Sequence, residues 1–423
     1  MRVRLAYGSG GLDVNVPSDR TTIIEPGFRA PVADPVGALI AALRAPLGRP
    51  PLRDVVRSGQ RVAISICDGT RSQPRREMLT AVLGEIGHVP ADHIVIMVAT
   101  GTHRGNTPAE FEAMLGADLL SRYRVVNHDA RNASSLECVG TTGSGVRVSL
   151  NREFLGADVR ITTGVVEPHF FAGFSGGPKM VAPGLAALDT VVTLHDARRI
   201  GDPMATWGVT EGNPIHDDVR EIARTVGVHF AVDVTVNRDK QITNVFAGDL
   251  FAEHRAACAA ARCDAMQAVP HPFDVVLTSN SGFPLDQNLY QAVKGLSAAA
   301  RVVKPGGTIV IAGECRDGVP AHGAYAQVLA SAPSAQELLD LINSPGYAVP
   351  DQWQVQIQAQ ILTKARVMMK ADGLQPEQLR AAHLEPIDDI GAAVAGALRR
   401  AGPDATLCVL PQGPRTIPYV ATD

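Results

Sequence analysis

The fold of this chain is decided by two segments, RVAISIC at residues 61–67 and HIVIMVAT at residues 93–100. Both are near-continuous apolar runs rich in β-branched residues, which is typical of strands buried on both faces of a sheet. Between them, residues 76–87 carry apolar side chains at helical spacing and end at Gly87, the expected C-cap. A strand, a helix and a strand at this spacing predict a βαβ unit in a parallel sheet.

The same alternation continues along the chain. Further strands are predicted at residues 159–163 and 230–236, an Ala-rich helix at 252–269, and then a strand at 273–278, a helix at 286–300 and a strand at 307–312. The pattern predicts the α/β class, with two α/β domains of mainly parallel sheets and an active-site cleft between them. We expect these domains at residues 1–262 and 272–398, followed by a terminal strand and tail at 399–423 that could belong to either sheet.

The composition excludes several classes of protein. A length of 423 residues favours two domains over one, and 45% hydrophobic with 19% charged residues is ordinary for a soluble enzyme. A net charge of −4 without any Lys/Arg run argues against a nucleic-acid partner. The absence of an apolar signal segment or a membrane-length apolar run favours a cytoplasmic protein without a membrane partner. The six cysteines are scattered and never form C-x-x-C, so we expect reduced thiols.

Polar turns follow several predicted strands. Residues 68–71 (DGTR) follow the first, 101–104 (GTHR) the second, and 279–284 (SNSGFP) the first strand of the second domain. Because ligands of open parallel sheets bind outside the carboxyl ends of the strands, we expect these turns to gather at the cleft.

The densest chemistry lies in residues 167–179 (EPHFFAGFSGGPK). Its three glycines permit backbone angles closed to other residues and let a bulky group approach the main chain. Lys179 is either a point charge or, when desolvated, a nucleophile that can hold a covalent group. His169 and His195 can bind a metal or move protons near neutral pH. The segment lacks the spacing of a phosphate-binding Walker loop.

Each candidate also has a simpler interpretation. Asp68 and Arg71 can orient an imidazole and clamp a carboxylate, or they can form a capping salt bridge. His103 can be a loop residue without a catalytic role, and His169 can be a histidine packed in the interior. His195 can be a helix-end residue that interacts favourably with the helix dipole.

Further along, Gln291 and Lys294 lie three residues apart on one side of the predicted helix at 286–300, directly after Tyr290. They could form a solvated face. However, Lys294 is the only charged residue between Asp286 and Arg301, which suggests an anionic partner.

Taken together, these residues resemble the nickel-pincer-dependent lactate racemase family of 2-hydroxyacid racemases and epimerases. The resemblance covers most of the chain and rests on five ordered blocks: residues 68–71, 101–104 and 167–179, His195, and 284–294 (PLDQNLYQAVK). The ten-residue step from His169 to Lys179 and the sixteen-residue step to His195 match the family's pattern. Ser72 departs from it, since the family commonly has proline there.

The resemblance implies a cofactor, the Ni(II)-pyridinium-3,5-bisthiocarboxylate mononucleotide (nickel-pincer nucleotide), bound covalently to Lys179 through a thioamide. It implies His195 as the nickel ligand, in a square-planar geometry that suits Ni(II). Cofactor contacts are implied for Asp68, Gly69, Thr70 and Arg71. Cofactor-biosynthesis and nickel-insertion proteins are the implied partners in maturation.

The resemblance also implies the reaction, which is racemisation or epimerisation of a small 2-hydroxy acid by reversible hydride transfer through a 2-keto acid. His103 and His169 are the implied acid–base pair. The implied substrate contacts are Arg71, Tyr290, Gln291 and Lys294. Hydride transfer avoids the costly deprotonation of a carbon next to a carboxylate.

Two other functions are compatible with the same residues. His103, His169 and His195 could hold zinc in a hydrolase with an open water site. Alternatively, Arg71 and Lys294 could form a carboxylate-binding module without catalysis. The sequence does not choose between lactate, malate, a longer or aromatic hydroxy acid and a sugar acid as the substrate.

Overall fold

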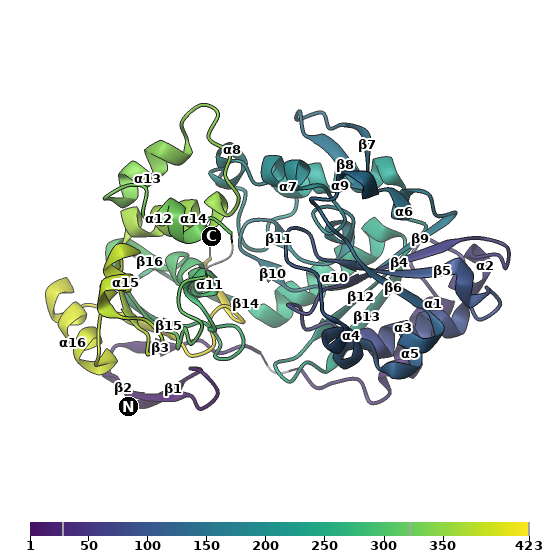
Figure 1. Ribbon diagram of the computed structural model, residues 1–423. Coiled ribbons are helices and arrows are strands. Elements are labelled where there is room, and N and C mark those ends of the chain that lie inside the picture. Colours follow the sequence, from purple (N-terminus) through teal and green to yellow (C-terminus); the bar gives the residue numbers. More distant parts are fainter. Residues whose placement is uncertain (28, 321–322, 422–423) are drawn as a thin grey trace. The chain divides into compact units, whose positions relative to one another are not determined.

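The computed structural model describes residues 1–27, 29–320 and 323–421 and divides the chain into two compact units (Figure 1). Unit one comprises Met1–Gly27, Asp196–Gly201 and Ala265–Asp423, and unit two comprises Phe28–His195 and Asp202–Asp264. Each contains a sheet with helices packed against it, so the predicted α/β class with mainly parallel sheets is confirmed.

The described part of unit two is built on a six-stranded sheet that is parallel except where β12 meets β13. In spatial order its strands are β13 (Ile242–Gly248), β12 (Phe230–Val236), β9 (Val159–Val165), β4 (Val62–Cys67), β5 (Ile94–Ala99) and β6 (Arg124–Asn127). Its helices are α1 (Pro35–Arg44), α2 (Leu52–Val55), α3 (Arg75–Glu85), α4 (Pro108–Leu115), α5 (Ala117–Arg122), α6 (Arg152–Leu155), α7 (Leu188–Leu194), α9 (Pro214–Val226) and α10 (Leu250–Ala265). Short turns and hairpins complete it: η1 (Ala91–His93), η2 (Ala133–Ser135), η3 (Gly177–Met180), β7 (Leu136–Thr141) with β8 (Arg147–Asn151), and β10 (Pro168–His169) with β11 (Gly173–Phe174).

Strand β4 shows why the segment at 61–67 is almost entirely apolar. Ile64 and Ile66 pack into a core with α1 and α3, whereas Ala63 faces a second core that includes α7 and α9. All six residues of the strand are buried because helices cover both faces of the sheet. The predicted βαβ unit is therefore confirmed as β4, α3 and β5. Its helix ends at Glu85 with Ile86 as C-cap, so Gly87 does not supply the expected cap.

Unit one contains a second six-stranded sheet among the described residues, and all its neighbouring strands are parallel. In spatial order its strands are β18 (Glu385–Pro386), β17 (Arg366–Lys370), β16 (Val303–Ala312), β15 (Phe273–Ser279), β19 (Leu407–Leu410) and β3 (Thr21–Ile23). Its helices are α8 (Ala197–Ile200), α11 (Leu289–Ala300), α12 (Tyr325–Leu329), α13 (Ala335–Ile342), α14 (Gln352–Lys364), α15 (Pro376–Ala381) and α16 (Ile390–Ala401). The hairpin of β1 (Arg2–Leu5) and β2 (Leu12–Asn15) packs its apolar side chains into the core with α16.

The units differ from the predicted domains at two places, the chain start and the segment Asp196–Gly201, which was expected in the first domain and belongs to unit one. The chain start, expected in the first domain, belongs to unit one, because Thr22 of β3 pairs with Cys408 of β19. Strand β19 itself, whose sheet was left open, lies in unit one. The end of the predicted helix at 252–269 is instead the strand β14 (Met266–Val269), which pairs in parallel with β20 (Ile417–Val420).

In the described parts of the chain, every helix falls short of the length or apolarity that crossing a bilayer requires.

Strands β9, β4 and β5 lie side by side and bring the polar loops of unit two together. The three strands are parallel neighbours, so their carboxyl ends lie at one edge of the sheet. The turns at 68–71 and 101–104 and the segment at 167–179 each follow one of these strands. The predicted gathering of these polar loops is therefore confirmed within unit two.

Candidate functional site

The turn after β4 holds the carboxylate of Asp68 in a fixed place. Its Oδ1 accepts hydrogen bonds from the Thr70 amide (3.1 Å) and hydroxyl (2.6 Å). Buried Arg75 fastens the turn from below, donating to the carbonyl of Cys67 at 2.8 Å and to that of Arg71 at 2.9 Å. Gly69 lies exposed at the tip of this turn. The Asp68 carboxylate is therefore held in position to accept a hydrogen bond from a neighbouring side chain.

That neighbour is His103, from the turn after β5. Its Nδ1 lies 2.7 Å from Asp68 Oδ2, and its side chain is 55% exposed while that of Asp68 is 7% exposed. Burial alone would raise the pKa of Asp68, but the hydrogen bond and charge of His103, with Thr70 and Arg71, lower it to about 2. An ionised carboxylate only accepts, so Nδ1 of His103 carries a proton, and in the neutral form of the ring Nε2 carries the lone pair.

Arg71 joins the same turn to the third loop. Its Nη1 lies 2.9 Å from Oε1 of Glu167, the first residue of segment 167–179, which we call the lysine segment. The pair of Asp68 with His103 thus joins the loops after β4 and β5. The pair of Arg71 with Glu167 joins the loops after β4 and β9. A carboxylate partner was predicted for Arg71, but Glu167, which lies 96 residues away, was not identified as that partner.

The aromatic ring of Phe171 gathers three of the predicted residues. Its centroid lies 4.5 Å from the ring of His169 and 5.0 Å from that of His195, and Nζ of Lys179 lies 5.6 Å from it. The segment reaches this arrangement by a two-residue hairpin, β10 with β11, followed by the turn η3 that carries Lys179. The structure therefore brings together the residues that the sequence proposed as tether, ligand and base.

The two buried histidines of this group are held in opposite tautomers. His195 is the C-cap of α7, and its Nδ1 lies 2.7 Å from the carbonyl of Val191, so Nδ1 donates and Nε2 carries the lone pair. Burial lowers the pKa of His195 to about 4; the bond to Val191 opposes this shift and the charge of Lys179 adds to it. In His169, by contrast, Nδ1 accepts from the Ala172 amide at 3.3 Å, so the proton of the neutral ring is on Nε2.

The remaining predicted residues lie on α11 in unit one. Nζ of Lys294 donates to Oε1 of Gln291 at 2.7 Å, which confirms that the two share one side of the helix. The hydroxyl of partly buried Tyr290 accepts from Nε1 of Trp353 at 3.2 Å, and its carbonyl accepts from Gln354. Sequence reasoning missed both supporting residues, although the repeated glutamines at 352, 354, 356 and 358 stand out among the apolar residues of α14.

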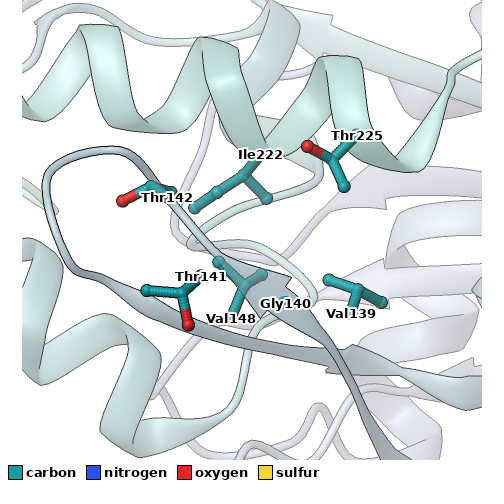
Figure 2. A pocket seen from close by; sticks show the side chains of 7 residues that line it. All are labelled: Val139, Gly140, Thr141, Thr142, Val148, Ile222 and Thr225. Carbon is teal, nitrogen blue, oxygen red and sulfur yellow. The ribbon is translucent and has the colours of Figure 1, made fainter.

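Two features of the described residues bear on other kinds of site. No three His, Cys, Asp or Glu side chains among them are arranged to hold a metal ion, so the zinc alternative with His103, His169 and His195 gains no support. Figure 2 shows a hollow between the β7–β8 hairpin and α9 that contains no predicted site residue. It is lined by Val139, Gly140, Thr141, Thr142, Val148, Ile222 and Thr225.

Comparison with known proteins matches nearly the whole chain. Residues 7–208 match the family described as the lactate racemase N-terminal domain, and residues 268–417 match the lactate racemase C-terminal domain. The chain is 34% identical over 417 residues to the lactate racemase of Thermoanaerobacterium thermosaccharolyticum, covering 97% of each protein. It is 36% identical over 372 residues to the lactate racemase of Lactiplantibacillus plantarum, covering 87% of each.

Solved structures agree. The lactate racemase apoprotein from Thermoanaerobacterium thermosaccharolyticum superimposes with a TM-score of 0.92 at 33% identity, over 99% of this chain and 100% of that one. A Thermotoga maritima protein gives a TM-score of 0.68 at 17% identity, over 93% of this chain and 100% of that one, which shows a shared fold alone.

Proposed function

The chain belongs to the lactate racemase family, whose members are isomerases, and we propose that it interconverts the enantiomers of a small 2-hydroxy acid such as lactate. The observation that carries the proposal is that the rings of His103 and His169 are held in opposite tautomers. The first presents a lone pair at Nε2 and the second a proton at Nε2. A racemase needs one group to take the hydroxyl proton and another to supply it, with the roles exchanged in the reverse direction.

In the proposed reaction, Nε2 of His103 removes the hydroxyl proton of one enantiomer. The ionised Asp68 behind the ring then stabilises the imidazolium that forms. His169 serves the other enantiomer, and the substrate passes through a 2-keto acid. The half-exposed His103 can exchange its proton with solvent more readily than buried His169, so the two directions of the reaction differ in how their protons are resupplied.

The residues around Phe171 fit the nickel-pincer nucleotide. Nε2 of a buried, neutral imidazole is a suitable nickel ligand, and His195 is held in that state by its bond to Val191. A lysine on a glycine-rich turn beside that imidazole fits a covalent tether, and Lys179 is so placed. When bound there, the group supplies an acceptor that takes hydride from C2 of the substrate and returns it. The proposal includes maturation by cofactor-making and nickel-insertion proteins.

The substrate carboxylate requires cationic partners. Arg71 is the candidate in unit two, where Glu167 already occupies one side of its guanidinium group. Tyr290, Gln291 and Lys294 are proposed as substrate contacts on the family resemblance alone, together with cofactor contacts from the turn at 68–71.

The test follows the C2 hydrogen. Protein co-produced with the cofactor-making proteins is first screened against a panel of 2-hydroxy acids by chiral chromatography. The best substrate, deuterated at C2, is then converted in H₂O. We expect the opposite enantiomer with its label largely retained, and a 2-keto acid that can be trapped. Extensive exchange of the label in a single turnover, without a trapped keto acid, would rule out hydride transfer while leaving racemisation intact.

A further inference from the structure

The lysine segment is held from beneath by buried polar side chains of three other elements. Each bonds to the backbone of the segment rather than to a side chain. The contacts are Asn213 Nδ2 to the Phe171 carbonyl (2.9 Å), His216 Nδ1 to the Ala172 carbonyl (3.2 Å), His254 Nε2 to the Ser175 carbonyl (2.9 Å), and the Gly177 amide to Asp233 Oδ2 (2.7 Å). These residues cap or lie on α9, β12 and α10 and are at most 4% exposed.

Among these contacts, the one from Asp233 lies nearest to Lys179 along the chain. Gly177 is the first residue of η3, and the amide of Lys179 donates to the carbonyl of Gly176 at 3.1 Å within the same turn. A hydrogen bond that fixes the Gly177 amide therefore fixes the direction in which Lys179 leaves the turn. The ammonium group is thereby kept against the ring of Phe171.

Glycines of the lysine segment and of β9 allow buried side chains to approach the backbone closely. A Cβ atom at Gly176 would lie 2.8 Å from Oδ2 of Asp233, and one at Gly164 on β9 would lie 2.4 Å from its Oδ1. A Cβ atom at Gly177 would lie 2.3 Å from Cγ of His254. At these positions the missing side chains leave room for Asp233 and His254, which the sequence pattern alone could not reveal.

We propose that Asp233 is a positioning residue for the cofactor tether, because its carboxyl group fixes the Gly177 amide and thereby the direction of Lys179. The inference rests on the proposed function, in which Lys179 carries the cofactor. Asp233 touches neither the substrate nor the reacting atoms in this account. Its effect on the reaction is exerted entirely through the lysine turn.

The electrostatic setting agrees with this role. Burial raises the pKa of Asp233 to about 7, against the opposing effect of the Gly177 amide, and raises that of neighbouring Glu253 well above its ordinary value. Burial likewise lowers the pKa of His216 to about 3 and that of His254 to about 4. Burial thus disfavours the charged form of each of these groups, and Asp233, with a pKa of about 7, is only partly ionised at neutral pH.

The experiment compares four proteins co-produced with the cofactor-making machinery: wild type, Asp233→Asn, Asp233→Leu and Glu253→Gln. Asparagine keeps an acceptor for the Gly177 amide, whereas leucine has a similar size and no acceptor. Glu253→Gln is the matched control, since it alters a fully buried carboxyl group that neighbours Asp233 and makes no described hydrogen bond to the turn. Intact mass gives the fraction of Lys179 modified over time, and thermal unfolding shows that each variant is folded.

We expect Asp233→Leu to load about tenfold more slowly, as when a buried backbone donor loses its partner. Asp233→Asn and Glu253→Gln should load within about twofold of the wild type. If Asp233→Leu does not fold, Asp233→Ser replaces it, because its hydroxyl group is too short to reach Gly177. The inference is overturned if the folded Leu or Ser variant loads as fast as the wild type, or if Glu253→Gln slows loading equally.

A second readout separates this inference from the proposed function. The cofactor-free protein is treated with limiting acetic anhydride, and acetylation of Lys179 is measured against that of exposed Lys240. Freeing the turn in Asp233→Leu should raise this ratio about fivefold, the factor that one ordinary hydrogen bond represents. An unmodified Lys179 in active, nickel-containing wild-type protein defeats the tether. An unchanged acetylation ratio defeats the role of Asp233.

Discussion

The lysine segment at 167–179 and the two turns at 68–71 and 101–104 lie at one edge of the same sheet, yet they hold their functional side chains differently. The lysine segment is mostly buried and is fixed through its backbone by side chains beneath it. The two turns are largely exposed and are fixed by side-chain pairs such as Asp68 with His103.

The difference matches two tasks. A covalent anchor and a metal ligand must stay in one place through every turnover, which backbone anchoring in a packed interior provides. A proton-transfer group must reach both substrate and solvent, which a half-exposed imidazole on a rigid carboxylate allows. Removing the anchor or the metal ligand should therefore disrupt binding of the cofactor or its metal, whereas changes to the proton-transfer histidines or to the two turns should leave the cofactor attached and slow the reaction.

The largest effect is expected from Lys179→Arg in the buried region. Arginine keeps the positive charge but remains protonated, so it cannot form the covalent bond. We expect no covalently attached nucleotide by intact mass and no measurable racemisation. Lys240→Arg, on an exposed turn, is the matched control and should behave as the wild type.

His195→Ala should come next. Removing the buried imidazole deletes the proposed ligand while Lys179 remains, so we expect the nucleotide to stay attached and the nickel to be lost. Metal analysis and near-UV/visible absorbance of the purified protein measure this. Full nickel content with full activity in His195→Ala would show that another group is the ligand.

His103→Gln and His169→Gln sharpen the comparison, since these two histidines lie one in each region. Loss of an acid–base group should reduce kcat by about 10²–10⁴ while the cofactor remains bound. The two variants should lower kcat in the two directions unequally, as initial rates at saturating concentrations of each enantiomer would show, whereas kcat/KM stays equal in both directions because the equilibrium constant of a racemisation is one. Exposed His271→Gln is the control, and equal losses in both directions for both variants would contradict the assigned roles.

The sequence predicted those parts of the molecule that depend on local pattern. Strands β4, β5 and β12 follow from their apolar runs, and the pairing of Gln291 with Lys294 follows from helical spacing. The edge where Asp68 and His103 meet follows from the rule that loops after parallel strands gather.

Contacts between distant segments were not accessible in the same way. Strand β3 has three residues, and nothing in them specifies β19, almost four hundred residues later, as the partner. Asp233 lies 56 residues from Gly177 and His254 lies 79 residues from Ser175, so no spacing argument connects them. The glycines at 176 and 177 signalled a close approach to the backbone, but only the structure identifies the buried side chains that make it.

Asp68→Asn tests the hydrogen bond by which Asp68 holds His103 in the exposed region. A hydrogen bond to a charged group is worth about 1.5–3 kcal/mol, so we expect kcat to fall roughly tenfold to a hundredfold with the cofactor retained. Stability should change with pH as well. The folded pKa of Asp68, about 2, lies below its ordinary 3.8, so its stabilisation is fully present above about pH 4 and is lost as the pH falls towards 2. Thermal unfolding of wild type and variant should therefore converge in acid, and a difference that grows below pH 4 would contradict the assignment.

The smallest effect is expected from Glu167→Gln, where the two regions meet. Oε1 of Glu167 lies 2.9 Å from Nη1 of Arg71, and the two side chains are 43% and 29% exposed, so the ion pair is worth at most about 1 kcal/mol. If Arg71 binds the substrate carboxylate, Glu167 competes for the same guanidinium group and repels the anion. Removing its charge should lower KM by up to about fivefold with little change in kcat. Arg71→Ala is the reference for losing the cation, and it should raise KM. A rise in KM for Glu167→Gln as well would mean that Glu167 orients Arg71 for the substrate rather than competing with it.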